Sequence, residues 1–161
     1  MSMIVREYRR EDVPAMMEIW NTVIEEANAF PQLEQLGEEG AIALFGAQSF
    51  TGVATSGEEI LGLYILHPNN VGRCGHIANA SYAIKRDCRG MGIGELLVRD
   101  SLRKGKELGF TRMQFNAVVS TNYGAIHLYE KLGFHRLGSI PDGFLLGDGT
   151  YRDIILYWIE L

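Results

Sequence analysis

The sequence predicts an α/β (α+β) fold: one mixed, mostly antiparallel sheet of about seven strands, with about four helices on both faces. Two observations predict it. Short runs with strand alternation and longer runs with helical spacing follow one another without a repeat, linker or low-complexity tract. Turn residues, glycine above all, separate these runs. The length of 161 residues suits one domain, so we expect a single domain over residues 1–161.

Periodicity and turn signals place each element. The first helix is expected to begin at an N-cap, Asp12, with Pro14 in its first turn. Glycines punctuate the second helix. The expected helices cover residues 13–27, 33–47, 92–108 and 122–132, and the expected strands cover residues 4–8, 50–54, 60–66, 76–84, 113–119, 134–140 and 151–160.

The third helix has a clear apolar face and a glycine stop. Ile93, Leu97, Ser101 and Leu108 share that face, and Gly109 follows as the residue that ends the helix. Turns at residues 141–143 and 148–149 are expected to separate the last two strands. The apolar run at residues 143–147 is expected to be an exposed loop, over a binding site or at a dimer contact.

Composition excludes several classes of protein. A net charge of -5 and a pI of about 5.4 argue against a nucleic-acid binder, which would show a basic face. Cys74 and Cys88 form no CxxC pair, so free thiols in a reducing compartment are expected. The start of the chain has no apolar signal core, and the apolar runs are too short to span a bilayer. We therefore expect a cytoplasmic protein with no membrane partner.

The strongest local signal is Arg89-Gly90-Met91-Gly92-Ile93-Gly94, between an expected strand and an expected helix. Alternate glycines let a bound group approach the backbone, and the first N–H groups of a helix carry a partial positive charge. A pyrophosphate fits there. A Walker loop would end in Gly-Lys-Ser/Thr, and a dinucleotide fold would need GxGxxG with a later acid, where Gln114 stands. The alternative is a helix start that is merely rich in glycine.

Two motifs at the expected separation resemble those of the Gcn5-related N-acetyltransferase (GNAT) superfamily. Arg89-x-x-Gly92-x-Gly94 is similar to its pyrophosphate loop. The run 122–134, NYGAIHLYEKLGF, is similar to its N-x-x-A-x-x-x-Y-x-x-x-G-F segment. The order of expected elements also matches along nearly the whole chain. The resemblance implies that superfamily's fold, in which the fourth and fifth strands splay apart and hold coenzyme A.

The resemblance implies acetyl-CoA as cosubstrate, with no metal, and assigns the residues that bind it. The backbone of Ala83 and Ile84 would contact the pantetheine arm at the splay, and Asn122 would hold that arm from the next helix. The pyrophosphate would be wrapped by Arg89, Gly90, Met91, Gly92, Ile93 and Gly94. A homodimer is expected by analogy alone.

The same resemblance makes Tyr129 the general acid. The reaction expels a thiolate, and a phenol with a pKa near 10 can protonate or hydrogen-bond it. Asn122 and Tyr129 are two helical turns apart and share a face. A backbone N–H near Ala83 would stabilise the oxyanion. The alternative for Tyr129 is a packed helix tyrosine.

Other reactive groups are weaker candidates. Glu25, Glu26, His76 or a water chain could serve as the general base, and none is assigned. Cys74-x-His76 lacks the second close pair that a metal site needs. Cys88 beside Arg89 could have a lowered pKa and carry an acetyl group, with His127 or His135 as its base, but direct transfer is favoured.

Two asparagines stand in expected mid-strand positions, where asparagine is disfavoured. Asn79 lies in HIANASY and Asn116 in MQFNAVV. One interpretation is that each tethers a neighbouring strand; the other is that both point at the acceptor. A narrower resemblance, to fungal acetyltransferases that detoxify L-azetidine-2-carboxylate and related proline analogues, implies the second and covers PNNVGR, HIANA and FNAVVSTN. In this interpretation Asn79 and Asn116 bind the carboxylate of the acceptor or orient its amine.

Together these observations predict an acetyl-CoA-dependent N-acetyltransferase. Its acceptor is expected to be a small-molecule amine, with an amino acid or proline analogue as the narrower hypothesis, and transfer is expected by direct attack in a ternary complex. The rivals are a protein or peptide N-acetyltransferase and a non-catalytic module that senses acyl-CoA.

Overall fold

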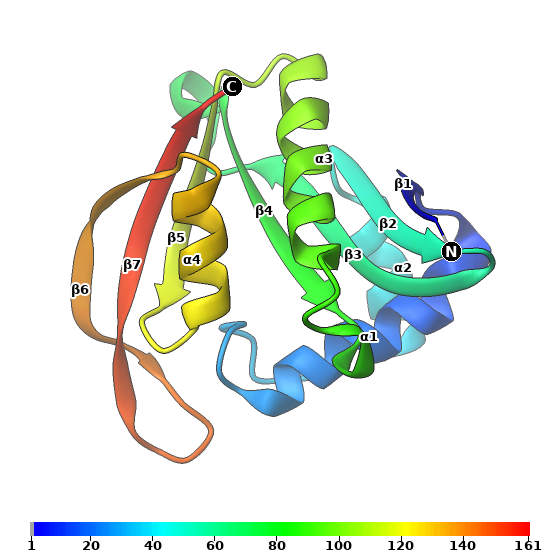
Figure 1. The fold of residues 1–161 in the computed structure, drawn as a ribbon, viewed down its shortest axis with the longest axis horizontal. Coiled ribbons are helices and arrows are strands. Elements are labelled where there is room, and N and C mark those ends of the chain that lie inside the picture. Colours follow the sequence, from blue (N-terminus) through cyan, green and yellow to red (C-terminus); the bar gives the residue numbers. More distant parts are fainter. Residues whose placement is uncertain (1) are drawn as a thin grey trace.

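The computed structural model describes residues 2–161 and contains a seven-stranded sheet in the order β1-β2-β3-β4-β5-β7-β6 (Figure 1). The strands are β1 (Met3–Glu7), β2 (Phe50–Ser56), β3 (Glu59–Pro68), β4 (Ile77–Ile84), β5 (Arg112–Val119), β6 (His135–Leu145) and β7 (Tyr151–Glu160). The helices are α1 (Val13–Glu26), α2 (Glu38–Gly46), α3 (Ile93–Glu107) and α4 (Tyr123–Lys131). The predicted order and type of these elements are confirmed.

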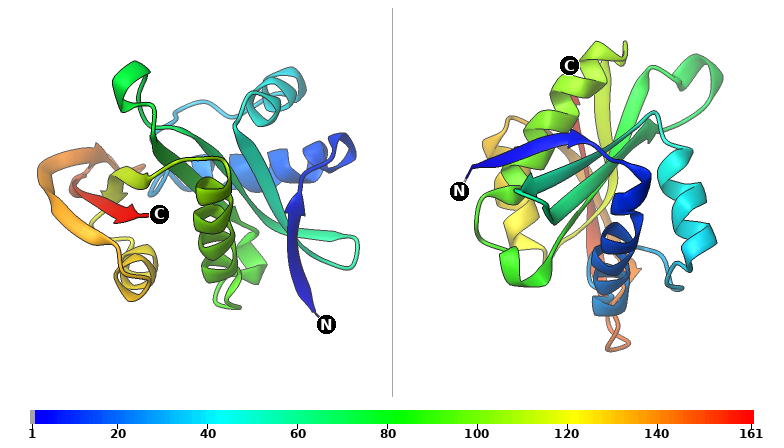
Figure 2. Two further views of the ribbon diagram at one scale, coloured as in Figure 1. Left: turned by 90° about the horizontal axis from the view of Figure 1, so that it is seen from above. Right: turned by 90° about the vertical axis from the view of Figure 1, so that its right-hand side faces the viewer.

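The sheet is antiparallel at every junction except one, the parallel pairing of β4 with β5. Helices α1 and α2 cover one face and α3 and α4 the other, which is clearest from above (Figure 2, left). This arrangement confirms the predicted fold class. A membrane-crossing helix is not found in the part of the chain that the structure describes.

The starts of α1 and α2 differ in detail from expectation. Asp12 occupies the N-cap position, but its carboxylate accepts from the Arg9 backbone N–H at 2.7 Å and the Arg6 guanidinium at 2.8 Å, within a preceding 3-10 turn. Helix α2 starts five residues later than predicted. The Asn21 carboxamide bonds both backbone groups of Leu36, which holds that segment extended, and Gly37 then caps the helix.

The span of helix α3 agrees with the prediction to within one residue at each end, but the packing of its last turn differs. Ile93, Leu97 and Ser101 are buried as predicted, but Leu108 is 48% exposed. Gly105 takes the inward position instead, because the Leu161 side chain packs so close that an added Cβ would lie 3.1 Å from it. Gly109 follows in a left-handed conformation, as expected for a residue that ends a helix.

The turn predicted at residues 141–143 is a bulge inside β6, not a chain reversal. The register of β6 against β7 shifts between Ile140 and Phe144, and Asp142 donates its backbone N–H to Asp153. Phe144 is consequently buried against Val119 and Ile154, so the prediction of a wholly exposed apolar loop was wrong there.

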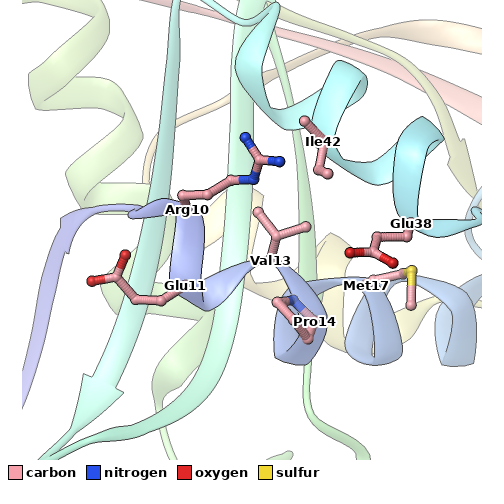
Figure 3. A pocket seen from close by; sticks show the side chains of 7 residues that line it. All are labelled: Arg10, Glu11, Val13, Pro14, Met17, Glu38 and Ile42. Atoms are coloured by element: carbon pink, nitrogen blue, oxygen red, sulfur yellow. The ribbon is translucent and has the colours of Figure 1, made fainter.

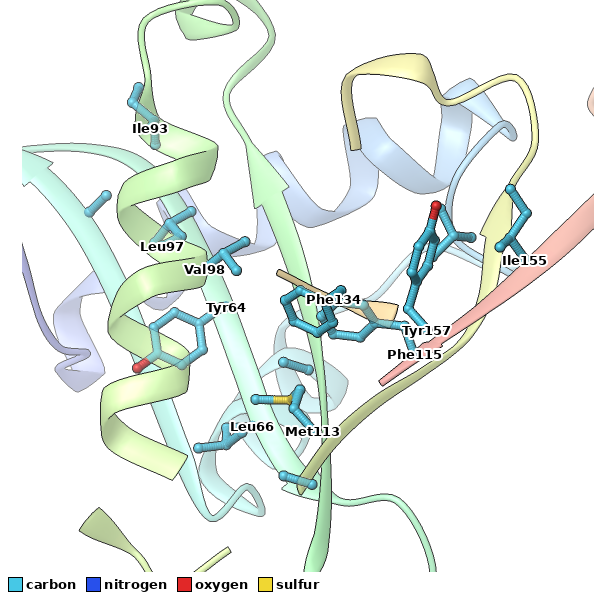
Figure 4. Close-up of a cluster of buried hydrophobic side chains, with 14 of the residues drawn as sticks. Tyr64, Leu66, Ile93, Leu97, Val98, Met113, Phe115, Phe134, Ile155 and Tyr157 are labelled. Carbon is cyan, nitrogen blue, oxygen red and sulfur yellow. The ribbon is translucent and has the colours of Figure 1, made fainter. Parts of the chain in front are cut away.

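Apolar side chains form a separate core on each face of the sheet. Between the sheet and α3/α4 lies a cluster that includes Tyr64, Leu97, Phe115, Phe134 and Tyr157 (Figure 4). Between the sheet and α1/α2 lies a second cluster built on α1. The first cluster draws side chains from strands on both sides of the β4–β5 junction, so it holds the two halves of the sheet together where their backbones separate.

Strands β4 and β5 separate after a short paired region. Only Ile77↔Arg112 and Ala78↔Met113 are paired, after which β4 continues to Ile84 without a partner on that side. The two strands start close together and diverge toward the start of α3 (Figure 1). The fold thus opens a wedge-shaped gap between β4 and β5, called the wedge below. The apolar cluster under α3 and α4 fills the space on one face of this gap.

One glycine in β2 tests the packing of this sheet. Gly52 lies beneath Tyr64, and an added Cβ would overlap the tyrosine ring, which is fully buried and donates its hydroxyl to Asp100 at 2.7 Å. We expect Gly52→Ala to lower the free energy of unfolding by about 1–3 kcal/mol, because overpacking forces the ring to move. Urea unfolding followed by circular dichroism measures this.

The matched control is the same substitution in α2. A Cβ on Gly40 would meet only the Leu36 side chain at 3.8 Å, an ordinary contact. Gly40→Ala should leave stability unchanged or raise it by up to about 1 kcal/mol, since alanine loses less entropy in a helix. Equal destabilisation by both variants would contradict the role given to Gly52.

Candidate active site

The glycine loop adopts the conformation that its glycines permit. Gly90 and Gly92 have φ values of 82° and 83°, in the left-handed region, and Gly92 is the N-cap of α3. The first helical hydrogen bond runs from the Leu96 N–H to the Gly92 carbonyl, so the N–H groups before Leu96 have no acceptor within the helix. Such a turn suits an anion, and a pyrophosphate fits it.

Gly94 has a different role, which is close packing. An added Cβ would lie 3.2 Å from Ile84 and 3.6 Å from Leu128. The first turn of α3 therefore touches both the end of β4 and α4. This contact places the loop at the wide end of the wedge between β4 and β5.

Arg89 is not directed at an open loop but is bound to α1. Its guanidinium donates to both carboxylate oxygens of Glu26, at 2.6 and 2.8 Å, and Arg86 approaches the same carboxylate at 3.4 Å. The hydrogen bond from Arg89 holds the pKa of Glu26 below its usual range, against burial, which would raise it. Glu26, one of the candidate bases, is thus a poor proton acceptor.

The open edge of β4 presents the backbone of alternate residues. The His76 carbonyl accepts from Thr111 at the start of β5, whereas the Lys85 N–H donates to Leu61 of β3. Backbone groups of a strand alternate in direction, so those of Tyr82 and Ile84 point into the wedge and those of Ala83 bond to β3. The backbone of Ile84 therefore faces the wedge. That of Ala83 does not, and Tyr82, which sequence reasoning omitted, faces the wedge in its place.

The same alternation specifies the backbone donor that was expected near Ala83 for the oxyanion. The N–H groups that the open edge offers there belong to Tyr82 and Ile84. Which residues of β4 face β5 depends on which of its residues bond to β3. That register is defined only in the folded sheet, so the sequence did not give it.

Tyr129 lies in an aromatic cluster that links the two walls of the wedge. Its ring centroid is 4.6 Å from that of Phe115 on β5, and Phe115 is 5.9 Å from Tyr82 on β4. Phe134 and Tyr157 complete the cluster at 5.4 and 5.9 Å from Tyr129. Phe115, Phe134 and Tyr157 are seen together in Figure 4.

The environment of Tyr129 keeps its hydroxyl protonated. Burial, and then the nearby Tyr157, raise the pKa of Tyr129. Within residues 2–161 its hydroxyl forms no hydrogen bond, whereas Tyr157 donates to Glu130 at 2.7 Å. A half-buried phenol with a spare proton beside an open strand edge can donate that proton to a ligand in the wedge.

Asn122 begins the helix that carries Tyr129. It is the N-cap of α4, and its side-chain oxygen accepts from the Ala125 N–H at 3.3 Å. The side-chain oxygen of Asn122 thus caps the helix, and its side-chain NH₂ group is left for another partner. Asn122, at the N-cap, and Tyr129, in the second turn of α4, are both half-buried.

Asn79 and Asn116 meet at one residue that sequence reasoning did not single out. Both donate their carboxamide N–H to the Asn69 side-chain oxygen, at 3.1 and 2.7 Å, and Gln114 donates to Asn116 at 2.9 Å. The cluster bridges the turn after β3, strand β4 and strand β5. The tethering interpretation therefore describes one part of their role, and the presence of Asn69 in the PNNVGR run was the available signal.

The remaining candidates lie elsewhere or are inert. Cys88 is buried, and burial followed by the Asp87 carboxylate raises the pKa of its thiol, so the lowered pKa considered for it is contradicted. Cys74 is exposed. No group of three or more potential metal ligands is found in residues 2–161. Glu25 and His76 are exposed, and neither has a contact that assigns it as the base.

A surface pocket of about 260 Å³ lies between the start of α1 and α2, away from the wedge (Figure 3). Its lining includes Arg10, Val13, Pro14, Met17, Glu38 and Ile42. It contains none of the predicted site residues, and its wall combines side chains of opposite charge with apolar side chains. The chemistry of the molecule is concentrated at the wedge.

Comparison with known proteins agrees with this architecture. A profile of the acetyltransferase (GNAT) family matches residues 8–134. N-acetyltransferase aca1 of Schizosaccharomyces pombe is 38% identical over 99 residues, which are 61% of this chain and 47% of that protein. This fungal relative is consistent with the narrower resemblance noted in the sequence.

Solved structures share the fold over almost their entire length. A GCN5-related N-acetyltransferase from Kribbella flavida has a TM-score of 0.93 and 29% identity, covering 99% of this chain and 98% of that one. A phosphinothricin acetyltransferase from Sinorhizobium meliloti, solved with acetyl-CoA, has a TM-score of 0.92 and 18% identity, covering 100% of this chain and 89% of that one.

With a seven-stranded sheet that opens between β4 and β5 and a family profile that covers most of its length, the chain belongs to the acetyltransferase (GNAT) family. It matches about half the length of its fungal relative aca1.

The two cysteines give a direct test of the site's chemistry. In the folded protein at pH 8 we expect a thiol reagent such as iodoacetamide to modify Cys74 quickly and Cys88 only after unfolding, because burial withholds Cys88 and disfavours its thiolate. Peptide mass spectrometry with and without urea identifies the labelled residue. Rapid labelling of Cys88 in the folded state would reopen an acetyl-cysteine route.

Proposed function

We propose that residues 1–161 form a single domain that acts as an acetyl-CoA-dependent N-acetyltransferase on the amine of a small molecule. The observation that carries the proposal is the wedge: β4 loses its β5 partner after Ala78, and Tyr129 packs on Phe115 of β5 in the aromatic cluster that reaches Tyr82 of β4. The structural neighbour from Sinorhizobium meliloti, solved with acetyl-CoA, supports the choice of cosubstrate.

The residues present fit acetyl-CoA as a cosubstrate. The left-handed glycines and the N–H groups at the start of α3 suit a pyrophosphate, which Gly90 to Gly94 would wrap. The open backbone groups of Tyr82 and Ile84 suit the amides of a pantetheine arm. The NH₂ group of Asn122 donates no hydrogen bond to residues 2–161 and is available to the same arm. The cosubstrate supplies an activated thioester carbonyl.

The acceptor amine attacks that carbonyl directly in a ternary complex. A carbon–nitrogen bond forms, the carbon–sulfur bond breaks, and the amine proton leaves to solvent. Tyr129 Oη gives its proton to the departing sulfur and regains one from water. N–H groups at the open edge of β4 stabilise the negative charge on the carbonyl oxygen as the bonds change.

We assign the acceptor to the α1/α2 face of the wedge. Asn79 alternates with the inward-facing residues of β4 that pack under α3, so it points to the opposite face, where Asn116 joins it. Two carboxamides at the narrow end of the wedge would hold a small polar amine. We propose Asn79 and Asn116 as the acceptor-binding residues.

Removal of one hydroxyl tests the role of Tyr129. We expect Tyr129→Phe to lower kcat by about 10²-fold or more while leaving coenzyme affinity unchanged, since the ring packing stays and only the acid is lost. Thiol release from acetyl-CoA across a panel of amino acids, proline analogues, polyamines and peptides measures the rate, and calorimetry measures coenzyme binding.

Tyr123→Phe is the matched control on the same helix. Tyr123 is 74% exposed, so its hydroxyl can be removed without change to kcat. If coenzyme bound but no amine were acetylated, an acyl-CoA sensor would replace the transferase; a preference for peptides would favour a protein acetyltransferase.

The pH profile gives an independent test. An acid must be protonated to act, and because the pKa of Tyr129 is raised, its active form persists to at least about pH 10. We expect kcat/KM to rise with pH as the acceptor amine deprotonates and to show no decline up to about pH 10. A decline centred at about pH 10 or below that Tyr129→Phe abolished would show that the pKa is not raised.

A further inference from the structure

Asn69 occupies a fixed position at the narrow end of the wedge. It follows Pro68, the last residue of β3, and its backbone N–H donates to the Ile77 carbonyl at 2.8 Å, which extends the β3–β4 ladder by one bond. Ile77 belongs to the first of the only two β4–β5 pairs. The backbone of Asn69 is therefore anchored where the sheet begins to open.

The side-chain oxygen of Asn69 uses both of its lone pairs within the wedge. It accepts one N–H from Asn79, the first β4 residue beyond the paired region, and one from Asn116, in the irregular stretch where β5 leaves the β7 register. These bonds prevent a flip of the Asn79 and Asn116 carboxamides that exchanges their oxygen and nitrogen, because a flip would turn an oxygen toward the Asn69 oxygen. A single oxygen thus sets the orientation of two side chains on opposite walls.

The network leaves hydrogen-bond donors in excess. Each carboxamide carries two N–H bonds, and Asn79 and Asn116 each give one to Asn69, which keeps its own NH₂ group unpaired among residues 2–161. The Asn116 oxygen is occupied by Gln114. No member of the cluster is charged, so the site offers neutral N–H groups that suit a carboxylate without demanding an ion pair.

A tether for stability alone would not require this arrangement. Asn116 and its bond to Asn69 are exposed, and hydrogen bonds exposed to water add little to the free energy of folding because water replaces them. The value of the network lies in the orientation that it imposes on the two amides.

We propose that Asn69 is a positioning residue for the acceptor site, and that the amides it orients select acceptors that bear a carboxylate next to the amine. This rests on the proposed function and adds a residue, Asn69, to it; an acceptor carboxylate is what the narrower resemblance in the sequence also implies. Asn69 acts through Asn79 and Asn116 and does not itself meet the reacting atoms.

The experiment compares L-proline with L-prolinamide, which share a ring and an amine and differ in the carboxylate. Thiol release and thermal unfolding are measured for wild type, Asn69→Ala and the control Asn70→Ala. Asn70 is the exposed neighbour, and its oxygen bonds only the Val71 N–H. The same series is repeated in an Asn79→Ala/Asn116→Ala background.

We expect Asn69→Ala to raise the KM for L-proline about tenfold relative to that for L-prolinamide, the size of one lost bond to a charged group. The KM for acetyl-CoA and the melting temperature should not change. In the Asn79→Ala/Asn116→Ala background, Asn69→Ala should change neither KM further, because Asn69 acts only through these two residues. Equal losses on both acceptors, or a loss that persists in that background, would overturn the proposal.

Calorimetry on the CoA-loaded protein separates this proposal from the proposed function. If L-proline binds, weakens with Asn69→Ala and is never acetylated, the transferase reaction fails and the role of Asn69 stands. If wild type neither acetylates L-proline nor binds it more tightly than L-prolinamide, the role of Asn69 is overturned, whatever other amine is a substrate.

Discussion

The parallel pairing of β4 with β5 is the constraint on which the rest of this structure depends. It consists of two residue pairs, and everything beyond them on either strand must find other partners. The backbone of β4 is left with an open edge inside the protein, a position that would be costly without a ligand or water. The apolar cluster under α3 and α4 makes the gap possible, because it joins side chains of β4 and β5 on one face of the sheet although their backbones have separated.

The parts around the gap are held from three directions. At the narrow end, Asn69 joins the two walls; at the wide end, Gly94 brings α3 against Ile84 and Leu128. Across the α1 face, Gly147 donates its N–H to the Ala27 carbonyl at 3.0 Å, so the loop after β6 is fastened to the end of α1. Contacts from several elements therefore hold the wedge at both of its ends and on its α1 face.

Local patterns in the sequence predicted the elements, their order and the loop geometry, since helical periodicity and left-handed glycines are determined by neighbouring residues. What could not be predicted are contacts that depend on register. The exchange of Ala83 for Tyr82 follows from the strand with which β4 pairs, and the binding of Arg89 by Glu26 joins residues 63 positions apart. Asn69 was visible in a motif, but its partners were not. Predictions of site residues carried by resemblance alone, among them Tyr129 and Asn122, stay predictions.

The pairing of Arg89 with Glu26 affects how a charged ligand would approach. Lys85 is likewise matched by Glu59 at 2.8 Å, and Arg86 shares Glu26, so each cation around the glycine loop already faces a carboxylate. The loop consequently projects little net potential into solution, and its attraction for phosphate comes from backbone dipoles that act at contact distance. Association with a polyanionic ligand should therefore depend only weakly on ionic strength, in contrast to sites that capture such ligands by long-range steering.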